Sequence, residues 1–252
     1  MSFYSSIVQA YDEIFPLNKM QAHLMEGLFS DLVGKKVLDC GCGTGSLAIE
    51  LGRRSAFVDA FDLDTSMIEK AKLKCPQAIN VHFATGDLLK VTDHYKANYY
   101  DLVYCLGNTL AHLPAIDQVN EYLRSVASVL HTGGFIVLQL VNYDWVIGND
   151  ISQLPTIESD KYVFDRDYVR QENGVIRFAT KLKDKHSGES YSQSLPLIPI
   201  LKDDLYKMLD GLFGEVRFYG SFKKEAWTER SFHTIVVAKK THRTKGVNRE
   251  IN

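Results

Sequence analysis

Short apolar runs alternate with amphipathic stretches over the first half of the chain. The apolar runs predict strands, and the stretches with apolar residues at helical spacing predict helices between them. Because strands that are apolar at nearly every position are buried on both faces, they indicate a parallel sheet covered by helices on each side. The expected strands are 36–40, 56–62, 81–85, 100–105 and 135–141, and the expected helices are 46–53, 65–74 and 116–130.

Polar and apolar residues alternate with a period of two after Gly148, over 161–170, 175–182 and 190–197. A period of two predicts strands with one wet face and one packed face. Asn173-Gly174 separates the first two of these runs, and Asn-Gly between strands is typical of a tight hairpin. We therefore expect an antiparallel insert in this part of the chain.

The stretch before the first strand has helical spacing that Pro16 interrupts, so a second helix is expected over 18–32. Such a segment either packs as a plain helix pair or forms a lid that carries Tyr4 or Tyr11 to a ligand. Towards the C-terminus we expect a helix over 201–212 and strands over 215–222 and 232–238. The two strands would form an antiparallel hairpin that closes one edge of the sheet.

Together these elements predict an α/β fold. Its centre is a doubly wound, Rossmann-like, mostly parallel seven-stranded sheet with an antiparallel last strand. An antiparallel β insert and an N-terminal helical lid complete it. The expected segments are the lid over 1–34, the sheet core over 35–148, the insert covering an acceptor site over 149–200, the end of the core sheet over 201–240 and a disordered basic tail over 241–252.

Composition narrows the class of protein. The chain has 252 residues, 45% of them hydrophobic and 24% charged, as in an ordinary soluble globular protein. Its net charge of −2 at pH 7 argues against a broad electrostatic grip on nucleic acid. No apolar run approaches the ~18 residues that a membrane span needs, and no secretory signal pattern is visible. We expect no membrane contact and a cytoplasmic protein, which could form a homo-oligomer.

The four cysteines, Cys40, Cys42, Cys75 and Cys105, are too few for a disulfide framework at this length. Cys40 and Cys42 are also too closely spaced for the usual metal-binding pair, and no His or Cys partners lie near them in the sequence. We therefore expect no metal site and a reducing compartment.

A glycine loop, Gly41-x-Gly43-x-Gly45, follows the first predicted strand and precedes a helix. Glycines let ligands touch the backbone, and the helix N-terminus adds unpaired N–H groups. The dinucleotide fingerprint needs a glycine where Ser46 stands, and a phosphate-binding P-loop needs a lysine after the glycines, so neither pattern is met. Asp39, at the end of the strand, suits a cationic amine better than a pyrophosphate, which it would repel.

Two further acids follow the next strands. Asp62 ends the second strand, where a carboxylate can accept both hydrogen bonds of a ribose diol. The alternative is a helix N-cap, which Asp64 could provide equally well. Asp87, in Gly86-Asp87-Leu88 after the third strand, can accept from an adenine amine beside an apolar residue, or it can cap a loop.

In order and spacing, Val37 to Leu51, Asp62, Asp87 and His131 to Val141 resemble a class I S-adenosylmethionine-dependent methyltransferase. The resemblance implies that the glycine loop holds the methionine part of the cofactor, Asp62 the ribose, and Leu63 with Asp87-Leu88 the adenine. The cofactor-binding residues that it implies are Asp39, Gly41, Cys42, Gly43, Gly45, Asp62, Leu63, Met67, Gly86, Asp87, Leu88 and Leu106.

The stretch from Cys105 to Pro114, with Asn142-Tyr143-Asp144 further on, is similar to the glycine/sarcosine N-methyltransferase branch. That similarity implies that Leu106 and His112 face the cofactor and that Asn108 faces the acceptor. In glycine N-methyltransferases an arginine just before the Asn-Tyr-Asp triplet clamps the acceptor's carboxylate. Val141 stands at that position and cannot form the bidentate ion pair, so we expect the acceptor not to be glycine bound in that manner.

The expected reaction is an in-line methyl transfer to a small-molecule acceptor, at an amine nitrogen or, alternatively, at an oxygen. His112, Asn108 and Tyr11 are the candidate catalytic residues. His112 serves either as a base or as a cofactor-positioning or core histidine. The hydroxyl or ring of Tyr11 or Tyr4 could contact the sulfonium.

The insert is expected to roof the acceptor. Three of its arginines either anchor an acidic acceptor or lie on solvated strand faces: Arg166, Arg170 and Arg177. Tyr143 and Trp145 could line the acceptor pocket, and Trp227 could lie at a loop tip or an oligomer contact.

The sequence also allows functions of other kinds. No Asn-Pro-Pro-Tyr run follows the fourth strand, as amino-methylating enzymes of DNA and RNA carry, so methylation of nucleic acid is less favoured. An oxidoreductase that uses NAD, disfavoured by Ser46, and a protein that binds the cofactor without turnover are the alternatives from other classes.

Overall fold

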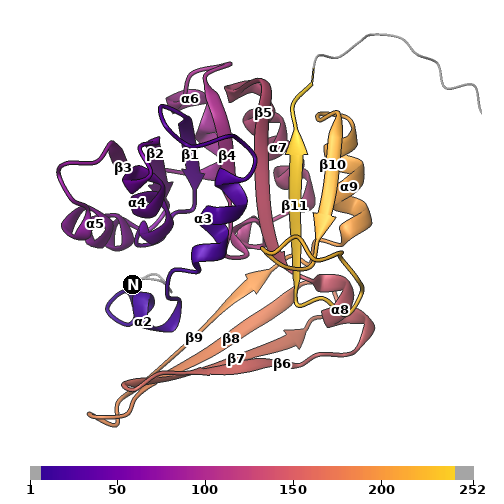
Figure 1. Ribbon diagram of the computed structural model, residues 1–252. Helices are drawn as coiled ribbons and strands as arrows, with labels where there is room; N and C mark the ends of the chain where they lie inside the picture. Colours follow the sequence, from indigo (N-terminus) through magenta and orange to yellow (C-terminus); the bar gives the residue numbers. More distant parts are fainter. Residues whose placement is uncertain (1–6, 242–252) are drawn as a thin grey trace, which may run out of the picture.

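The computed structural model describes residues 7–241 and contains two sheets (Figure 1). The larger sheet has seven strands in the order β10-β11-β5-β4-β1-β2-β3. Five of them run parallel, and β11 lies antiparallel to both β5 and β10. The strands are β1 (Lys36–Cys40), β2 (Phe57–Asp62), β3 (Val81–Thr85), β4 (Tyr100–Cys105), β5 (Leu130–Val141), β10 (Glu215–Tyr219) and β11 (His233–Lys239). The predicted doubly wound sheet with an antiparallel last strand is confirmed.

Helices cover both faces of this sheet, as the all-apolar strands require. One core layer contains Leu123 and Leu205, from the helices on the α7 and α9 side. The other contains Leu24, Ile49 and Ile68, from α3, α4 and α5. The helices are α3 (Lys19–Glu26), α4 (Ser46–Arg53), α5 (Thr65–Lys74), α6 (Val91–His94), α7 (Ile116–Val129), α8 (Tyr143–Gly148) and α9 (Lys202–Asp210), with short 3-10 turns over η1 (Leu88–Lys90) and η2 (Thr109–His112).

The second sheet is the predicted antiparallel insert, with the order β6-β7-β8-β9. Its strands are β6 (Gln153–Glu158), β7 (Tyr162–Arg170), β8 (Ile176–Asp184) and β9 (Ser190–Leu197). In Figure 1 it lies below the end of the central sheet at which β1, β2 and β4 finish. The short helix α2 (Tyr11–Ile14) lies between the two sheets, at the free end of the insert.

Helix α2 and the turn that precedes it have their own apolar contacts with the insert. Ile7, Ala10 and Ile14 form a buried cluster with Tyr162, Phe164 and Leu182 of β7 and β8. The stretch before β1 is therefore more than a helix pair on the core, because it joins the core to the insert.

Several expectations about the elements were wrong. The second N-terminal helix ends at Glu26, where Gly27 caps it, and not at Leu32. The first strand of the insert, β6, was missed because it contains Pro155; β6 is an edge strand, where a proline need not cost a ladder bond. Strand β5 begins at Leu130 and runs through the two glycines that were expected to precede it.

The predicted division into five segments stays a prediction. The basic tail falls almost wholly on 242–252, and Tyr4 falls on 1–6, so both lie outside the described residues.

Candidate functional site

A cavity of about 850 Å³ opens at the carboxyl ends of β1, β2 and β4. Ligands of open α/β sheets bind at this edge. Thirteen of the fifteen predicted site residues line the cavity: Tyr11, Asp39, Gly41, Cys42, Gly43, Asp62, Leu63, Met67, Gly86, Asp87, Leu88, Leu106 and His112. Gly45 and Asn108 do not.

The glycine loop is held in place by β2. The backbone N–H groups of Gly41 and Cys42 both donate to the carbonyl of Phe61, at 2.8 and 2.9 Å. Gly41 and Gly43 have positive φ values of +80° and +54°, which side chains rarely adopt. A Cβ on Gly41 would lie 2.5 Å from Thr109 Cγ2, and a Cβ on Gly43 would lie 3.1 Å from the hydroxyl oxygen of Tyr11. The loop therefore has no room for side chains where it borders the cavity.

Gly45 lies behind this loop. A Cβ there would approach Phe83 to 2.4 Å and Ala71 to 3.1 Å, and its φ is +73°. The third glycine is needed for the close packing of α4 on the sheet, and the structure does not bring it to the cavity.

The side chain of Asn108 is also directed elsewhere. Its amide donates to the hydroxyl of Tyr143 at 2.9 Å and accepts from the N–H of Val141 at 3.1 Å. Asn108 thus fastens the loop after β4 to the end of β5. Its left-handed φ of +67° fits this loop position, which asparagine tolerates better than most residues.

Asp62 lines the cavity at the end of β2. One carboxylate oxygen accepts from the N–H of Gly43 at 2.8 Å, and the other accepts from the N–H of Asp64 at 2.9 Å. Burial raises the pKa of Asp62 above its ordinary value, although these backbone N–H groups oppose the rise. The cap of α5 is Asp64, whose carboxylate accepts from Ser66 and Met67, so Asp62 is left to face the cavity.

Asp39 is 3% exposed and accepts a 2.8 Å hydrogen bond from the hydroxyl of Tyr104. Burial raises the pKa of Asp39 to about 8, and the nearby charge of Asp62 adds to the rise, while the bond from Tyr104 opposes it. A cation placed beside Asp39 would offset this desolvation, so the site favours a positively charged group.

The carboxylate of Asp87 accepts from the N–H of Leu89 at 2.9 Å and so caps η1. The loop-cap alternative therefore holds for Asp87, which also lines the cavity together with Leu88. One carboxylate can do both, because each oxygen has two lone pairs.

His112 and Tyr11 are two further titratable groups that line the cavity. Burial lowers the pKa of His112 to about 4. Burial also raises the pKa of Tyr11 far above its usual range, and the charge of Asp62 adds to this. At neutral pH both side chains are therefore uncharged.

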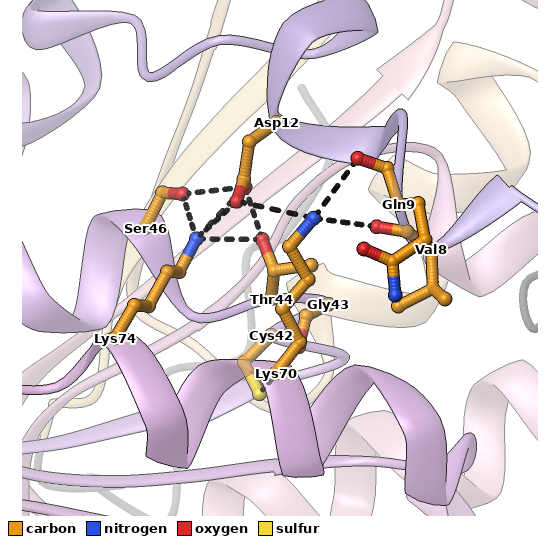
Figure 2. Close-up of polar contacts among 9 residues, drawn as sticks. All are labelled: Val8, Gln9, Asp12, Cys42, Gly43, Thr44, Ser46, Lys70 and Lys74. Atoms are coloured by element: carbon orange, nitrogen blue, oxygen red, sulfur yellow. Dashed lines mark hydrogen bonds and ion pairs between the residues drawn. The ribbon is translucent and has the colours of Figure 1, made fainter.

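A polar cluster that the sequence did not reveal fixes α2 on the glycine loop (Figure 2). Asp12 accepts hydrogen bonds from the hydroxyls of Thr44 and Ser46 and pairs with Lys74 at 2.8 Å. Lys74 Nζ also donates to these two hydroxyls, at 2.9 and 2.7 Å. Burial raises the pKa of Asp12, but the bonds from Lys74 and Thr44 outweigh it, so the pKa lies below its ordinary value.

Lys70, one turn before Lys74, holds the chain that leads into α2. Its Nζ donates to the carbonyl oxygens of Val8 and Gln9, at 2.7 and 3.2 Å (Figure 2). The i,i+4 spacing of the two lysines was the only sequence signal of this cluster, because it places both on one face of α5.

On its other side, α2 is bonded to the insert. The carboxylate of Glu13 accepts from the hydroxyl of Ser159 and from the N–H of Lys161. Adjacent acids, Asp12 and Glu13, thus connect one short helix to the glycine loop and to the β6–β7 turn.

The aromatic residues beyond the cavity have packing partners. Trp145 lies 5.7 Å from the ring of Phe232, and Tyr143 is fully buried. Trp227 Nε1 donates to Thr234 at 3.0 Å, beside β11. None of these three residues lines the cavity described above.

Comparison with known proteins bears on the class of this protein. Residues 37–134 match a methyltransferase domain family. A glycine/sarcosine N-methyltransferase from Aphanothece halophytica is 27% identical over 210 residues, which cover 82% of this chain and 76% of the relative. A ubiquinone biosynthesis O-methyltransferase from Shewanella sp. (strain ANA-3) is 26% identical over 127 residues, 50% of this chain and 52% of that protein.

The fold is shared by a S-adenosylmethionine-dependent methyltransferase from Clostridium acetobutylicum ATCC 824, with a TM-score of 0.77 at 16% identity. The likeness covers 95% of this chain and 100% of that one. Fold, domain match and relatives together define a Rossmann-like transferase. They support a class I S-adenosylmethionine-dependent methyltransferase, with S-adenosylmethionine as its cofactor.

Between residues 7 and 241, no helix is long and apolar enough to cross a membrane. In the same range, His, Cys, Asp and Glu side chains form no group of three or more that could hold a metal ion. All four cysteines are free thiols.

Proposed function

We propose that this enzyme methylates an amine nitrogen of a small molecule, with the cofactor lying across the carboxyl edge of the sheet. The observation that carries the proposal is the pairing of two acids along one cavity wall. Asp39 is suited to a cationic amine, and Asp62 lies on the next strand, beside the glycine loop. A sulfonium nucleoside has a cationic amino group that would lie beside Asp39 and a ribose that would lie beside Asp62.

The residues present fit such a cofactor. The side-chain-free backbone of Gly41 and Gly43 would accept its methionine part beneath Tyr11. Asp62 keeps lone pairs for ribose hydroxyls after accepting its two backbone N–H groups. Leu63, Met67, Gly86, Asp87 and Leu88 would frame the adenine. Leu63 is 74% exposed, as expected for a residue that a ligand covers.

The cofactor supplies a methyl group on sulfur that is already activated for displacement. The protein's own residues would align the acceptor and exclude water. The cavity is also lined by apolar side chains, which include Phe15, Leu17, Leu106, Leu113 and Leu195. An acceptor nitrogen placed there is desolvated and meets the methyl group without competition from water.

The weak basicity of His112 supports nitrogen over oxygen. A hydroxyl acceptor needs a base that can take its proton, and a histidine with a pKa of about 4 is poorly matched to that task. An amine needs only to arrive with its lone pair free. Under this proposal His112 positions ligands as a neutral hydrogen-bonding group.

Binding and turnover would test the proposal separately. Calorimetric titration with S-adenosylhomocysteine should give a clear heat for the wild type and a much weaker one for Asp62→Ala. A library of paired amines and alcohols, followed by mass spectrometry for methylated product, should then give turnover with amines. Turnover with alcohols only would favour O-methylation. Tight binding without any turnover would favour a cofactor-binding protein.

A further inference from the structure

The inner face of the insert carries one arginine among buried side chains. Alternate residues of a strand share a face, so Tyr162, Phe164, Arg166 and Tyr168 of β7 point the same way. The three aromatic residues are at most 8% exposed. Phe164 packs against the cavity-lining Phe15, with ring centroids 5.7 Å apart.

Arg166 does not itself line the cavity, but its cross-strand row of side chains is next to a row that does reach it. Tyr168 pairs across the sheet with Phe178, which pairs in turn with Leu195, another residue of the cavity wall. On this face of the insert, the side chain of Arg166 therefore lies between two neighbours. One is Phe164, which contacts the cavity residue Phe15, and the other is the Tyr168 row, which ends in Leu195.

A chain of polar groups leads to Arg166 from the opposite side. The N–H of Gly107, in the cavity wall, donates to the side-chain oxygen of Gln139 at 2.8 Å. The amide nitrogen of Gln139 lies 3.1 Å from Nδ1 of His233. Burial lowers the pKa of His233, and the positive charge of Arg166 lowers it further.

The positive charge of Arg166 has no counter-ion among residues 7–241. Nη2 donates to the carbonyl oxygen of Pro155 at 2.6 Å, but Nε is shielded from solvent and lacks a hydrogen-bond partner in this range. Burial lowers the pKa of Arg166, and no carboxylate opposes this effect. An uncompensated, half-buried guanidinium is costly, and a bound anion would satisfy it.

The other two candidate arginines do not share this situation. Arg170 donates to the carbonyl oxygens of Val146 and Ile147, at 2.8 and 2.7 Å, and lies 3.4 Å from Asp150. Arg177 is exposed, in register with Val169 on the outer face of the sheet. Only Arg166 of the three combines an inner-face position with unused donors.

We propose that Arg166 anchors a carboxylate of the methyl acceptor, so that the substrate is an amine that also carries an acidic group. This inference rests on the proposed function and narrows its substrate class. The carboxylate would enter between Leu195 and Gly107 and lie next to His233. The arginine that binds it would come from the insert. The core sheet offers no arginine at this place, because the residue paired with His233 is the uncharged Val141.

The anion site can be tested without knowing the acceptor. The probe is acetate, added to the protein saturated with S-adenosylhomocysteine, and the readout is the pKa of His233 followed by NMR. Acetate should raise that pKa in the wild type and in the outer-face control Arg177→Gln, but not in Arg166→Gln. Sodium chloride at equal ionic strength controls for screening. Equal responses to acetate and chloride, or an unchanged response in Arg166→Gln, would overturn the proposal.

Turnover then tests the substrate class with amines that differ only by a carboxylate: phenylalanine with phenethylamine, tyrosine with tyramine, histidine with histamine. For the acid that is methylated, Arg166→Gln should raise KM about 10- to 100-fold with little change in kcat. Arg166→Lys should recover part of this loss, which a folding defect would not show. Preference for the decarboxylated partners would refute the acidic acceptor. Failure to bind S-adenosylhomocysteine would instead refute the proposed function. In that case the acetate titration of the ligand-free protein would still show whether Arg166 binds an anion.

Discussion

Lys74 Nζ lies 2.8 Å from one carboxylate oxygen of Asp12 and 2.9 Å from the other. The two residues are 62 positions apart, and their contact fixes a helix of four residues on the glycine loop. So short a helix is not stable by itself, and its position depends on these tertiary contacts.

Replacing Asp12 should therefore loosen the cover over the cofactor. Asp12→Ala removes the acceptor of Thr44, Ser46 and Lys74 and leaves a half-buried lysine without its counter-ion. We expect S-adenosylhomocysteine to dissociate about tenfold faster, as stopped-flow fluorescence would measure. The exposed Asp93→Ala is the matched control. Equal dissociation rates in both variants would contradict a role for α2 in holding the ligand.

The glycines of the loop should differ in what their replacement damages. Gly45→Ala forces a Cβ into Phe83 at a positive φ, so it should lower the free energy of unfolding by about 2 kcal/mol. Gly43→Ala meets the ring of Tyr11 at the cavity and should weaken S-adenosylhomocysteine binding about tenfold, with a smaller effect on stability. Chemical denaturation and calorimetry separate the two effects. Similar losses of stability in both variants would speak against this division.

Binding of the cofactor should release a proton from Asp39. With a pKa of about 8, the carboxyl of the ligand-free protein is mostly protonated at pH 7. A cationic amine beside it lowers the pKa, so the proton leaves as the ligand binds. Calorimetry in phosphate and in Tris should give heats that differ by the buffers' ionisation enthalpies for the wild type but not for Asp39→Asn. Identical heats for the wild type in the two buffers would disprove this coupling.

His112 should make the protein less stable in mild acid. Its pKa falls from 6.5 in the unfolded chain to about 4 in the folded protein. Between these values the unfolded state binds more protons, so stability is present above 6.5 and is lost as the pH falls towards 4. Melting temperatures at pH 7, 6 and 5 should fall less steeply for His112→Asn than for the wild type. His186→Asn, on an exposed turn, should follow the wild type; a parallel fall in all three proteins would remove His112 as the cause.

The central sheet was predictable because its strands are apolar on both faces and its loops carry glycines and acids at fixed strand ends. The position of Asp62 at the cavity followed from the same regularity. The insert was only partly predictable, since Pro155 suppresses the strand signal of β6 although an edge position tolerates it.

What the sequence could not reveal depends on contacts between distant segments. Asp12, Thr44 and Lys74 lie in three separate segments of the chain, and no local sequence pattern predicts that they are in contact. Arg166 and Arg170 have the same strand parity, so periodicity cannot tell them apart. They differ because the carbonyl groups of α8 and Asp150 are bonded to one of them, which only the tertiary structure determines.

Helix α2 touches the glycine loop through Asp12 and the insert through Glu13 and Ile14. If α2 swings away to admit one substrate, it exposes the compartment of the other as well. Because one helix contacts both the glycine loop and the insert, we expect Asp12→Ala to speed the dissociation of cofactor and acceptor alike. Dissociation rates measured for each ligand would show whether the two compartments open together.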